Sequence, residues 1–168
     1  SHYATMAGRH WIEQLARVPA VVELGSEVRY RNPVFLPGDL IVAVSQSGET
    51  VDTLGAVKAA RAAGAKVLAV CNVVDSAIPR SSDGALYTHA GPEIGVASTK
   101  CFTAQLAALL LLAVHLGRCK GTLSEGRARE VLQALVQVSG GMRAALDQAH
   151  AVLTIARKYH NAQDMLFL

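Results

Sequence analysis

Short apolar runs alternate with longer helical patterns along the first 117 residues of the chain. Three runs of small and branched apolar residues are typical of buried parallel strands: Leu40–Val44, Lys66–Val70 and Ala85–Tyr87. Helical spacing or alanine-rich composition predicts helices over Ser1–Arg17 and Val51–Ala63, and a long helix that ends near Gly117. The alternation predicts an α/β fold with an open parallel sheet flanked by helices on both faces. Its ligand site is expected at the carboxyl ends of the strands.

The segments between these elements predict turns and one further strand. Ala20–Leu24 is a short strand candidate, and Ser26–Arg31 is a turn or a short helix. Pro37-Gly38-Asp39 predicts a turn before the central strand, and Gly64 suits the position just after the end of a helix. If the helix at Ser1 follows a strand, as the later helices do, the first strand of the sheet precedes Ser1.

Beyond residue 118 the pattern becomes helical. Thr122-Leu123-Ser124-Glu125 has the spacing of a capping box and predicts a helix to about Ser139, which Gly140-Gly141 separates from another helix ending near Tyr159. Met165–Leu168 is apolar and predicts the start of a further strand. We therefore expect a ligand-binding subdomain over residues 1–118. Residues 119–168 are expected to form connecting helices and the start of a truncated second subdomain.

Composition supports a globular protein and excludes several classes. Of the 168 residues 51% are hydrophobic, which allows a sizeable core, and the formal net charge of +3 comes from scattered basic residues, so nucleic-acid binding is not expected. The apolar run Leu106–Leu116 is too short to cross a bilayer and predicts a buried helix. Cys71, Cys101 and Cys119 lack metal-binding spacing, so we expect three free thiols in a reducing cytosol and no metal site.

A polar loop follows the central strand and precedes the next helix. The first backbone N–H groups of a helix have no intrahelical partner and lie at the positive end of its dipole, so they favour an anion. The loop adds hydroxyl groups, one amide and one glycine that permits a close backbone approach: Ser45, Gln46, Ser47, Gly48 and Thr50. This pattern indicates a phosphate site. The alternative interpretation is that the hydroxyls only cap the helix. The single glycine and the missing lysine argue against a dinucleotide or Walker loop.

A second polar loop, His89–Lys100, precedes the long helix and offers another helix N-terminus. Ser98 and Thr99 supply hydroxyl groups there, and Ser98 is equally well explained as a helix cap. His89 lies where an acid–base histidine would be placed, although a histidine in such a position is more often a loop or core residue. Glu93 is chemically suited to act as a base, and Lys100 either to form a Schiff base or to be solvated. The sequence assigns no catalytic residue.

Four stretches occur in this order along the chain: Ser26–Arg31, Ser45–Thr50, Tyr87–Lys100 and Phe102–Gln105. Together they resemble the isomerase part of the glucosamine-6-phosphate synthases, which are glutamine–fructose-6-phosphate aminotransferases (isomerizing) built from sugar isomerase (SIS) domains. The resemblance runs from Ser1 to about Gly117. It implies a flavodoxin-like SIS fold and a phosphosugar ligand.

Position by position, the resemblance also implies site residues. Ser45, Gln46, Ser47 and Thr50 would hold the sugar phosphate, and Val96, Ala97 and Ser98 would line the sugar. Ser1 matches the last residue of the family's Gly-Thr-Ser turn and would also touch the sugar. The order Ser1-His2-Tyr3 departs from the usual Ser-Tyr-His.

The family further implies substrates and partners. The substrates are fructose 6-phosphate and glucosamine 6-phosphate, in cytoplasmic amino-sugar biosynthesis (toward UDP-GlcNAc). The family uses no metal or cofactor in this part. The enzyme is expected to be a homo-oligomer that binds neither membranes nor nucleic acid. The family's glutaminase domain and second SIS subdomain are missing here, together with its catalytic glutamate, sugar-bound lysine and ring-opening histidine, so the fragment alone is expected to be inactive. The alternative is a stand-alone SIS sensor that binds a phosphosugar and regulates a transcription factor or kinase.

Overall fold

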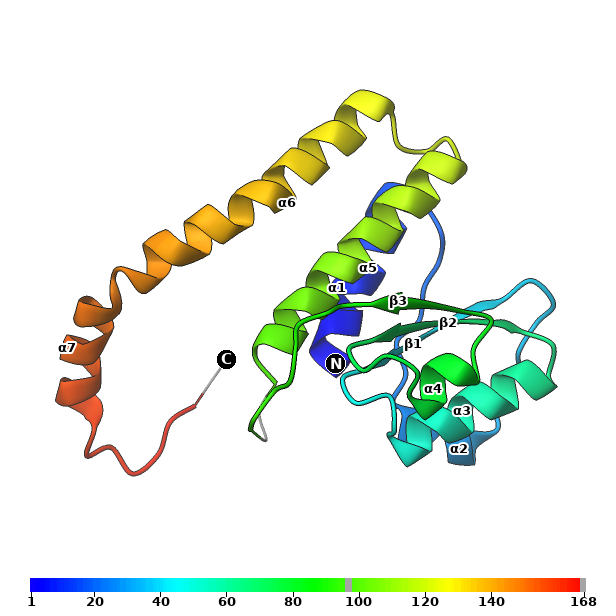
Figure 1. Cartoon of the computed structure of the whole chain (residues 1–168), viewed down its shortest axis with the longest axis horizontal. Coiled ribbons are helices and arrows are strands. Elements are labelled where there is room, and N and C mark those ends of the chain that lie inside the picture. Colours follow the sequence, from blue (N-terminus) through cyan, green and yellow to red (C-terminus); the bar gives the residue numbers. More distant parts are fainter. Residues whose placement is uncertain (96–97, 167–168) are drawn as a thin grey trace. The chain divides into compact units, whose positions relative to one another are not determined.

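A three-stranded parallel sheet lies at the centre of the N-terminal part of the chain (Figure 1). The computed structural model describes residues 1–95 and 98–166, and the strands have the spatial order β1-β2-β3. They are β1 (Leu40–Ser45), β2 (Lys66–Cys71) and β3 (Gly84–Tyr87). The pairing register aligns Ser45 with Cys71 and Cys71 with Tyr87, so all three strands end at one edge of the sheet. The three predicted strands are confirmed.

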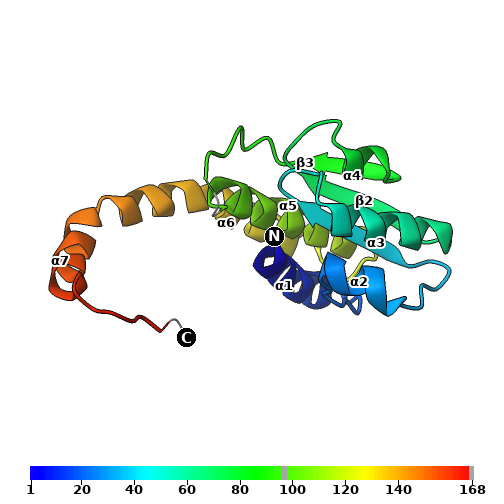
Figure 2. The same cartoon turned by 90° about the horizontal axis from the view of Figure 1, so that it is seen from below.

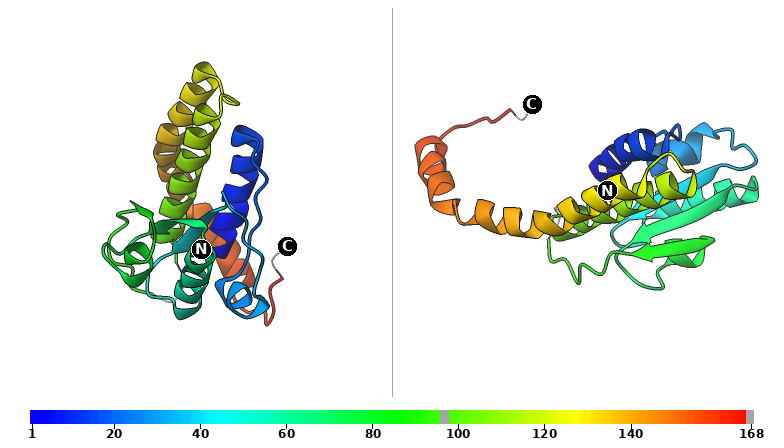
Figure 3. Two further views of the ribbon diagram at one scale, coloured as in Figure 1. Left: turned by 90° about the vertical axis from the view of Figure 1, so that its right-hand side faces the viewer. Right: turned by 90° about the horizontal axis from the view of Figure 1, so that it is seen from above.

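Helices cover both faces of this sheet, as predicted (Figures 1 and 2). On one face lie α3 (Val51–Ala62) and the short α4 (Ala77–Arg80), with α2 (Gly25–Arg31) packed against α3. On the other lie α1 (His2–Trp11), which continues as the π-helical turn η1 (Ile12–Ala16), and α5 (Lys100–Cys119). Figure 3 shows α1 beside α5, and the two helices are in contact.

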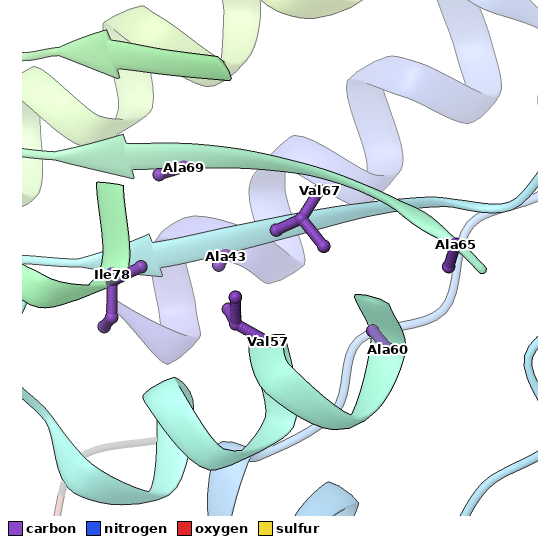
Figure 4. Packing of buried hydrophobic residues seen from close by; sticks show 7 residues of the cluster. All are labelled: Ala43, Val57, Ala60, Ala65, Val67, Ala69 and Ile78. Carbon is purple, nitrogen blue, oxygen red and sulfur yellow. The ribbon is translucent and has the colours of Figure 1, made fainter. Parts of the chain in front are cut away.

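The alternation of side chains along β1 and β2 builds a separate core on each face. Ala43, Val67 and Ala69 face α3 and pack with Val57 and Ile78 in the cluster drawn in Figure 4. On the opposite face, Val70 packs with Ala4 of α1 and Leu109 of α5, and Val42 and Val44 join them. Two covered faces explain why the strands read as nearly continuous apolar runs rather than as alternating ones.

The C-terminal end of α5 packs closely against the end of η1. Gly117 lies so close to η1 that a β-carbon there would be 2.7 Å from the Leu15 carbonyl oxygen. The same oxygen accepts a hydrogen bond of 2.8 Å from Thr122 Oγ1, and Arg17, which ends η1 in the left-handed conformation, accepts one from Lys120 Nζ. The hydroxyl of Thr122 therefore bonds to η1. At the start of the next helix, α6 (Glu125–Leu146), Ser124 Oγ accepts the N–H of Arg127.

The long helix α5 is a core helix by its packing. Its buried residues include Gln105, Leu109 and Ala113, and it contacts α1, η1 and β2. With 20 residues it is, in the part of the chain that the structure describes, the one helix long and apolar enough to cross a membrane. The buried helix expected at Leu106–Leu116 is confirmed, and it extends well beyond that run at both ends.

The strand predicted at Ala20–Leu24 is not formed. This segment is irregular, with Val21 81% exposed, and it pairs with no strand among the described residues. A strand needs a neighbour for its backbone groups, but a cavity lined by Val21, Leu24 and β1 separates this segment from the free edge of β1. The short helix at Ser26–Arg31 and the turn at Pro37–Asp39 are confirmed.

The helices after α5 also differ from the prediction. The chain divides into compact units at residues 1–128 and 129–168, and α6 (Glu125–Leu146) runs straight through Gly140-Gly141 before α7 (Ala149–Tyr159). A glycine costs a helix only about 0.5–1 kcal/mol, which the good helix formers around this pair offset. Met165 and Leu166 form no strand, and residues 167–168 lie outside the described residues.

We expect Gly117→Ala to lower the free energy of unfolding by about 1–3 kcal/mol, because the added β-carbon overlaps the Leu15 carbonyl and forces α5 away from η1. Urea denaturation of the full chain measures this. Gly140→Ala is the matched control, since it lies inside α6 with open space around it and should be neutral or stabilising. Equal effects of the two substitutions would contradict the close α5–η1 contact.

Candidate functional site

The loop from Ser45 to Thr50 joins the carboxyl end of β1 to the N-terminus of α3. Gly48 has a φ of +70°, which turns the chain, and Thr50 is extended and accepts the first backbone hydrogen bond of α3 from Leu54. Thr50 is thus the capping residue by position, yet its side chain makes no capping hydrogen bond. Capping of α3 therefore does not account for the hydroxyl groups of this loop.

Backbone amides of the loop donate to its serine oxygens. The N–H of Gly48 donates to Ser45 Oγ (3.0 Å), and the N–H of Glu49 donates to Ser47 Oγ (3.2 Å). A hydroxyl has one hydrogen to donate and two lone pairs, so an oxygen that already accepts keeps its hydrogen for another acceptor. Ser45 Oγ and Thr50 Oγ1 are 3.4 Å apart, which lets one of them donate to the other. Ser47 Oγ, together with one hydroxyl of the Ser45–Thr50 pair, therefore keeps a hydrogen for an acceptor outside the loop.

Gly48 packs without a side chain against the residues that follow β2. A β-carbon at Gly48 would lie 1.9 Å from Ser76 Oγ and 2.7 Å from Cys71 Sγ. The Gly48 carbonyl accepts the N–H of Ile78 (2.9 Å), and Glu49 Oε1 accepts the N–H of Ala77 (2.8 Å). The conformation of the phosphate-loop candidate is therefore fixed by its contact with the start of α4.

A cavity of about 840 Å³ lies next to this loop. Its walls are the free edge of β1, the start of α1, parts of α2 and α3, and the irregular segments on either side of α2. It is lined by five of the predicted site residues, Ser1, Ser45, Gln46, Ser47 and Thr50. The volume falls in the usual range for small-molecule sites. Four charged residues also line the cavity: Arg31, Glu23, Asp39 and Asp52. Arg31 is paired with Glu23 at 2.6 Å, and Asp52 is paired with Arg29 at 3.0 Å.

Glu93 organises the second loop by accepting hydrogen bonds from the start of α5. Its carboxylate accepts from the Thr99 N–H (2.7 Å), from Thr99 Oγ1 (3.1 Å) and from Ser98 Oγ (2.9 Å). The backbone hydrogen bond from Thr99, followed by hydrogen bonding to Cys101, lowers the pKa of Glu93 from 4.5 to about 2. A carboxylate this weakly basic is a poor proton acceptor, so Glu93 is a structural anion here.

Cys101 is a buried thiol at the start of α5. Burial raises the pKa of the Cys101 thiol, hydrogen bonding to the Glu93 carboxylate raises it further, and hydrogen bonding to Gln46 opposes this shift. One turn later on the same buried face of α5, Gln105 Nε2 donates to Ser1 Oγ at 3.0 Å.

Asn72 holds the second loop onto the end of β2. Its Oδ1 accepts from the Ala90 N–H (2.7 Å) and from Thr88 Oγ1 (3.1 Å), and its Nδ2 donates to the Gly91 carbonyl (2.9 Å). Sequence reasoning missed Asn72, Ser76 and Gln105. The available signal for Asn72 was a polar residue directly after a buried strand.

The remaining predicted residues lie elsewhere. Ser98 is exposed and is not among the described residues that line the cavity, and Val96 and Ala97 lie outside the described residues. His89, in the left-handed conformation with its ring 6.1 Å from that of Tyr87, and Lys100 are both exposed and do not line the cavity either. Among residues 1–95 and 98–166, no group of three His, Cys, Asp or Glu side chains is placed to hold a metal ion.

Comparison with known proteins gives a consistent family. A profile described as SIS domain matches residues 1–115. Proteins named glutamine–fructose-6-phosphate aminotransferase [isomerizing] are 51% identical over 166 residues in Leifsonia xyli and 46% identical over 168 residues in Zymomonas mobilis. They match 99% and 100% of this chain, which spans only 27% and 28% of their lengths.

A solved structure agrees with these relatives. The C-terminal domain of glucosamine-fructose-6-phosphate aminotransferase from Francisella tularensis superposes with a TM-score of 0.92 at 37% identity. The match covers 96% of this chain and 46% of that domain. The expected fold is therefore confirmed by a structure as well as by sequence.

Gly48→Ala should destabilise the chain more than Gly38→Ala. Both glycines have positive φ, so each substitution costs about 1–2 kcal/mol in backbone conformation. Gly38 has open space, whereas the new β-carbon at Gly48 overlaps Ser76 and Cys71, which adds about 1–3 kcal/mol. Urea denaturation measures both variants, and equal losses would argue against the close contact at Gly48.

Glu93 should stabilise the second loop only where it is ionised. Because its pKa is lowered from 4.5 to about 2 in the folded chain, its contribution is present above pH 4.5 and is lost as the pH falls toward 2. We therefore expect Glu93→Gln to lower the melting temperature at pH 7, and this difference from the unmodified chain to shrink between pH 4.5 and 2. A difference that stays constant over that range would contradict the hydrogen-bonded carboxylate.

Proposed function

This chain belongs to the SIS domain family, and from that premise we propose that it is the phosphosugar-binding part of a glutamine–fructose-6-phosphate aminotransferase (isomerizing). Its ligands are fructose 6-phosphate and glucosamine 6-phosphate, in the synthesis of amino sugars. The phosphosugar-binding subdomain comprises residues 1–118, and residues 119–168 lead into further parts of the enzyme. The names of the relatives support this enzyme role over a stand-alone phosphosugar sensor.

One observation carries the proposal. Ser45 and Ser47 line a cavity at the N-terminus of α3 while their oxygens accept backbone N–H groups, so Ser47 keeps its hydrogen for a ligand, and Ser45 and Thr50, which can share one hydrogen bond, leave a second hydrogen between them. A phosphate monoester offers several acceptor oxygens and a charge that the helix N-terminus favours. Gln46 and Thr50 border the same space. We therefore assign the phosphate to this loop and the sugar to the adjoining cavity.

The residues around the ligand bind and orient it, and none is placed to move its protons. Glu93 is held ionised with a pKa of about 2, and His89 and Lys100 do not line the described cavity. Isomerisation needs a base near C1 and C2 of the sugar, and amination needs an amine that attacks or forms an imine. We propose that a second SIS subdomain and a glutaminase domain supply these steps in a cytoplasmic homo-oligomer. The 168-residue chain alone should bind in the millimolar range and form no product.

Ser47→Ala and Thr50→Ala should each weaken binding of glucosamine 6-phosphate about tenfold, because each removes a hydrogen bond to a charged group. An NMR titration of the full chain follows affinities of this order. Thr103→Ala is the control, since this exposed hydroxyl bonds within α5 and does not line the cavity. Glucosamine without its phosphate should bind far more weakly, and equal affinity for both sugars would refute the phosphate site. Added salt should weaken binding only mildly, because the loop has no lysine or arginine.

A further inference from the structure

Gln105 is a buried polar residue whose side-chain amide donates a hydrogen bond but accepts none. Its side chain lies on the inner face of α5, and the residue is 1% exposed. Nε2 donates to Ser1 Oγ at 3.0 Å, across 104 residues of sequence. Oε1 is buried and has no hydrogen-bond partner.

Stability alone does not explain an amide at this position. A buried acceptor without a partner is costly, and an apolar side chain of similar shape avoids that cost. Around it, Leu109 and Phe102 already form an apolar cluster with Ala4 and Val70. A leucine or methionine at position 105 would suit those surroundings. What the amide adds is its single hydrogen bond to Ser1.

That hydrogen bond decides what the Ser1 hydroxyl offers to the cavity. Ser1 directly precedes α1, but its side chain makes no capping bond to that helix, and it lines the cavity. Because Oγ accepts from Gln105, its own hydrogen is left for an acceptor outside the protein. With the amide reversed, Oε1 would take that hydrogen, and Ser1 would face the ligand only as an acceptor.

The same arrangement occurs at two other serines of the cavity. Ser45 and Ser47 accept from the backbone N–H groups of Gly48 and Glu49, and Ser1 accepts from a side-chain N–H. Within the loop the local backbone supplies the donor, and at Ser1 a side chain of α5 supplies it.

We propose that Gln105 is a positioning residue of the phosphosugar site: it holds the Ser1 hydroxyl as a hydrogen-bond donor directed at an acceptor oxygen of the bound sugar phosphate. This role rests on the proposed function. It requires no contact between Gln105 and the ligand, and it makes the effect of Gln105 on binding depend wholly on Ser1.

The test is a double-mutant cycle on the full 168-residue chain with Ser1→Ala and Gln105→Met, using NMR titration with fructose 6-phosphate. Methionine keeps the length of the side chain and removes the donor. Each single variant should bind about five- to tenfold more weakly, the loss expected for one hydrogen bond to a charged ligand. The double variant should bind no more weakly than Ser1→Ala alone. Gln14→Met, at an exposed position of η1, is the control and should bind normally.

Thermal unfolding separates positioning from a structural role. Gln105→Met removes an unpaired buried acceptor, so its melting temperature should equal or exceed that of the unmodified chain while its affinity falls. The proposal is overturned if Gln105→Met binds normally, or if it weakens binding as much in the Ser1→Ala background as alone. If the unmodified chain itself does not bind fructose 6-phosphate, the proposed function fails, and the role of Gln105 fails with it.

Discussion

Gly48 lies with its α-carbon directly against Ser76 and Cys71, and the polar edge of the sheet depends on that contact. Since no side chain intervenes, the loop after β1 and the residues after β2 share one close interface, which the hydrogen bond from Ile78 to the Gly48 carbonyl holds together. The left-handed φ of Gly48 accompanies the return of its N–H to Ser45 Oγ. A residue with a β-carbon would lift the loop from this interface, and the serines would lose the amides that orient them.

Two opposite hydrogen-bonding arrangements follow at this edge. Ser1 and Ser47 accept N–H groups of the protein and keep their hydrogens, whereas Ser98 gives its hydrogen to Glu93 and keeps its lone pairs. The proposed ligand has a matching polarity, because its phosphate is rich in acceptors and its sugar carries hydroxyl donors.

The parts of this structure that sequence predicts are those set by local patterns. The three apolar runs form strands because both faces of the sheet are covered, and the Ser45–Thr50 loop follows from the strand that precedes it. Ala20–Leu24 fails as a strand, because strand formation depends on a neighbour that no local pattern reveals. The hydrogen bond between Gln105 and Ser1 depends on packing between α1 and α5, so no local sequence pattern predicts it either. Glu93 reads as a catalytic base from its chemistry alone, and only its three hydrogen bonds show otherwise.

The distance along the chain between Ser1 and Gln105 has a kinetic consequence. Paired residues of β1 and β2, such as Leu40 and Lys66, are about four times closer in sequence than this pair, which adds about 1.2 kcal/mol of loop-closure entropy to the longer contact. Contacts between distant residues form later than local ones during folding. We therefore expect the Ser45–Thr50 loop between β1 and α3 to form before the contact between Ser1 and Gln105. During synthesis on the ribosome, Ser1 emerges long before the helix that holds it, so a nascent chain lacks a finished pocket until α5 has docked.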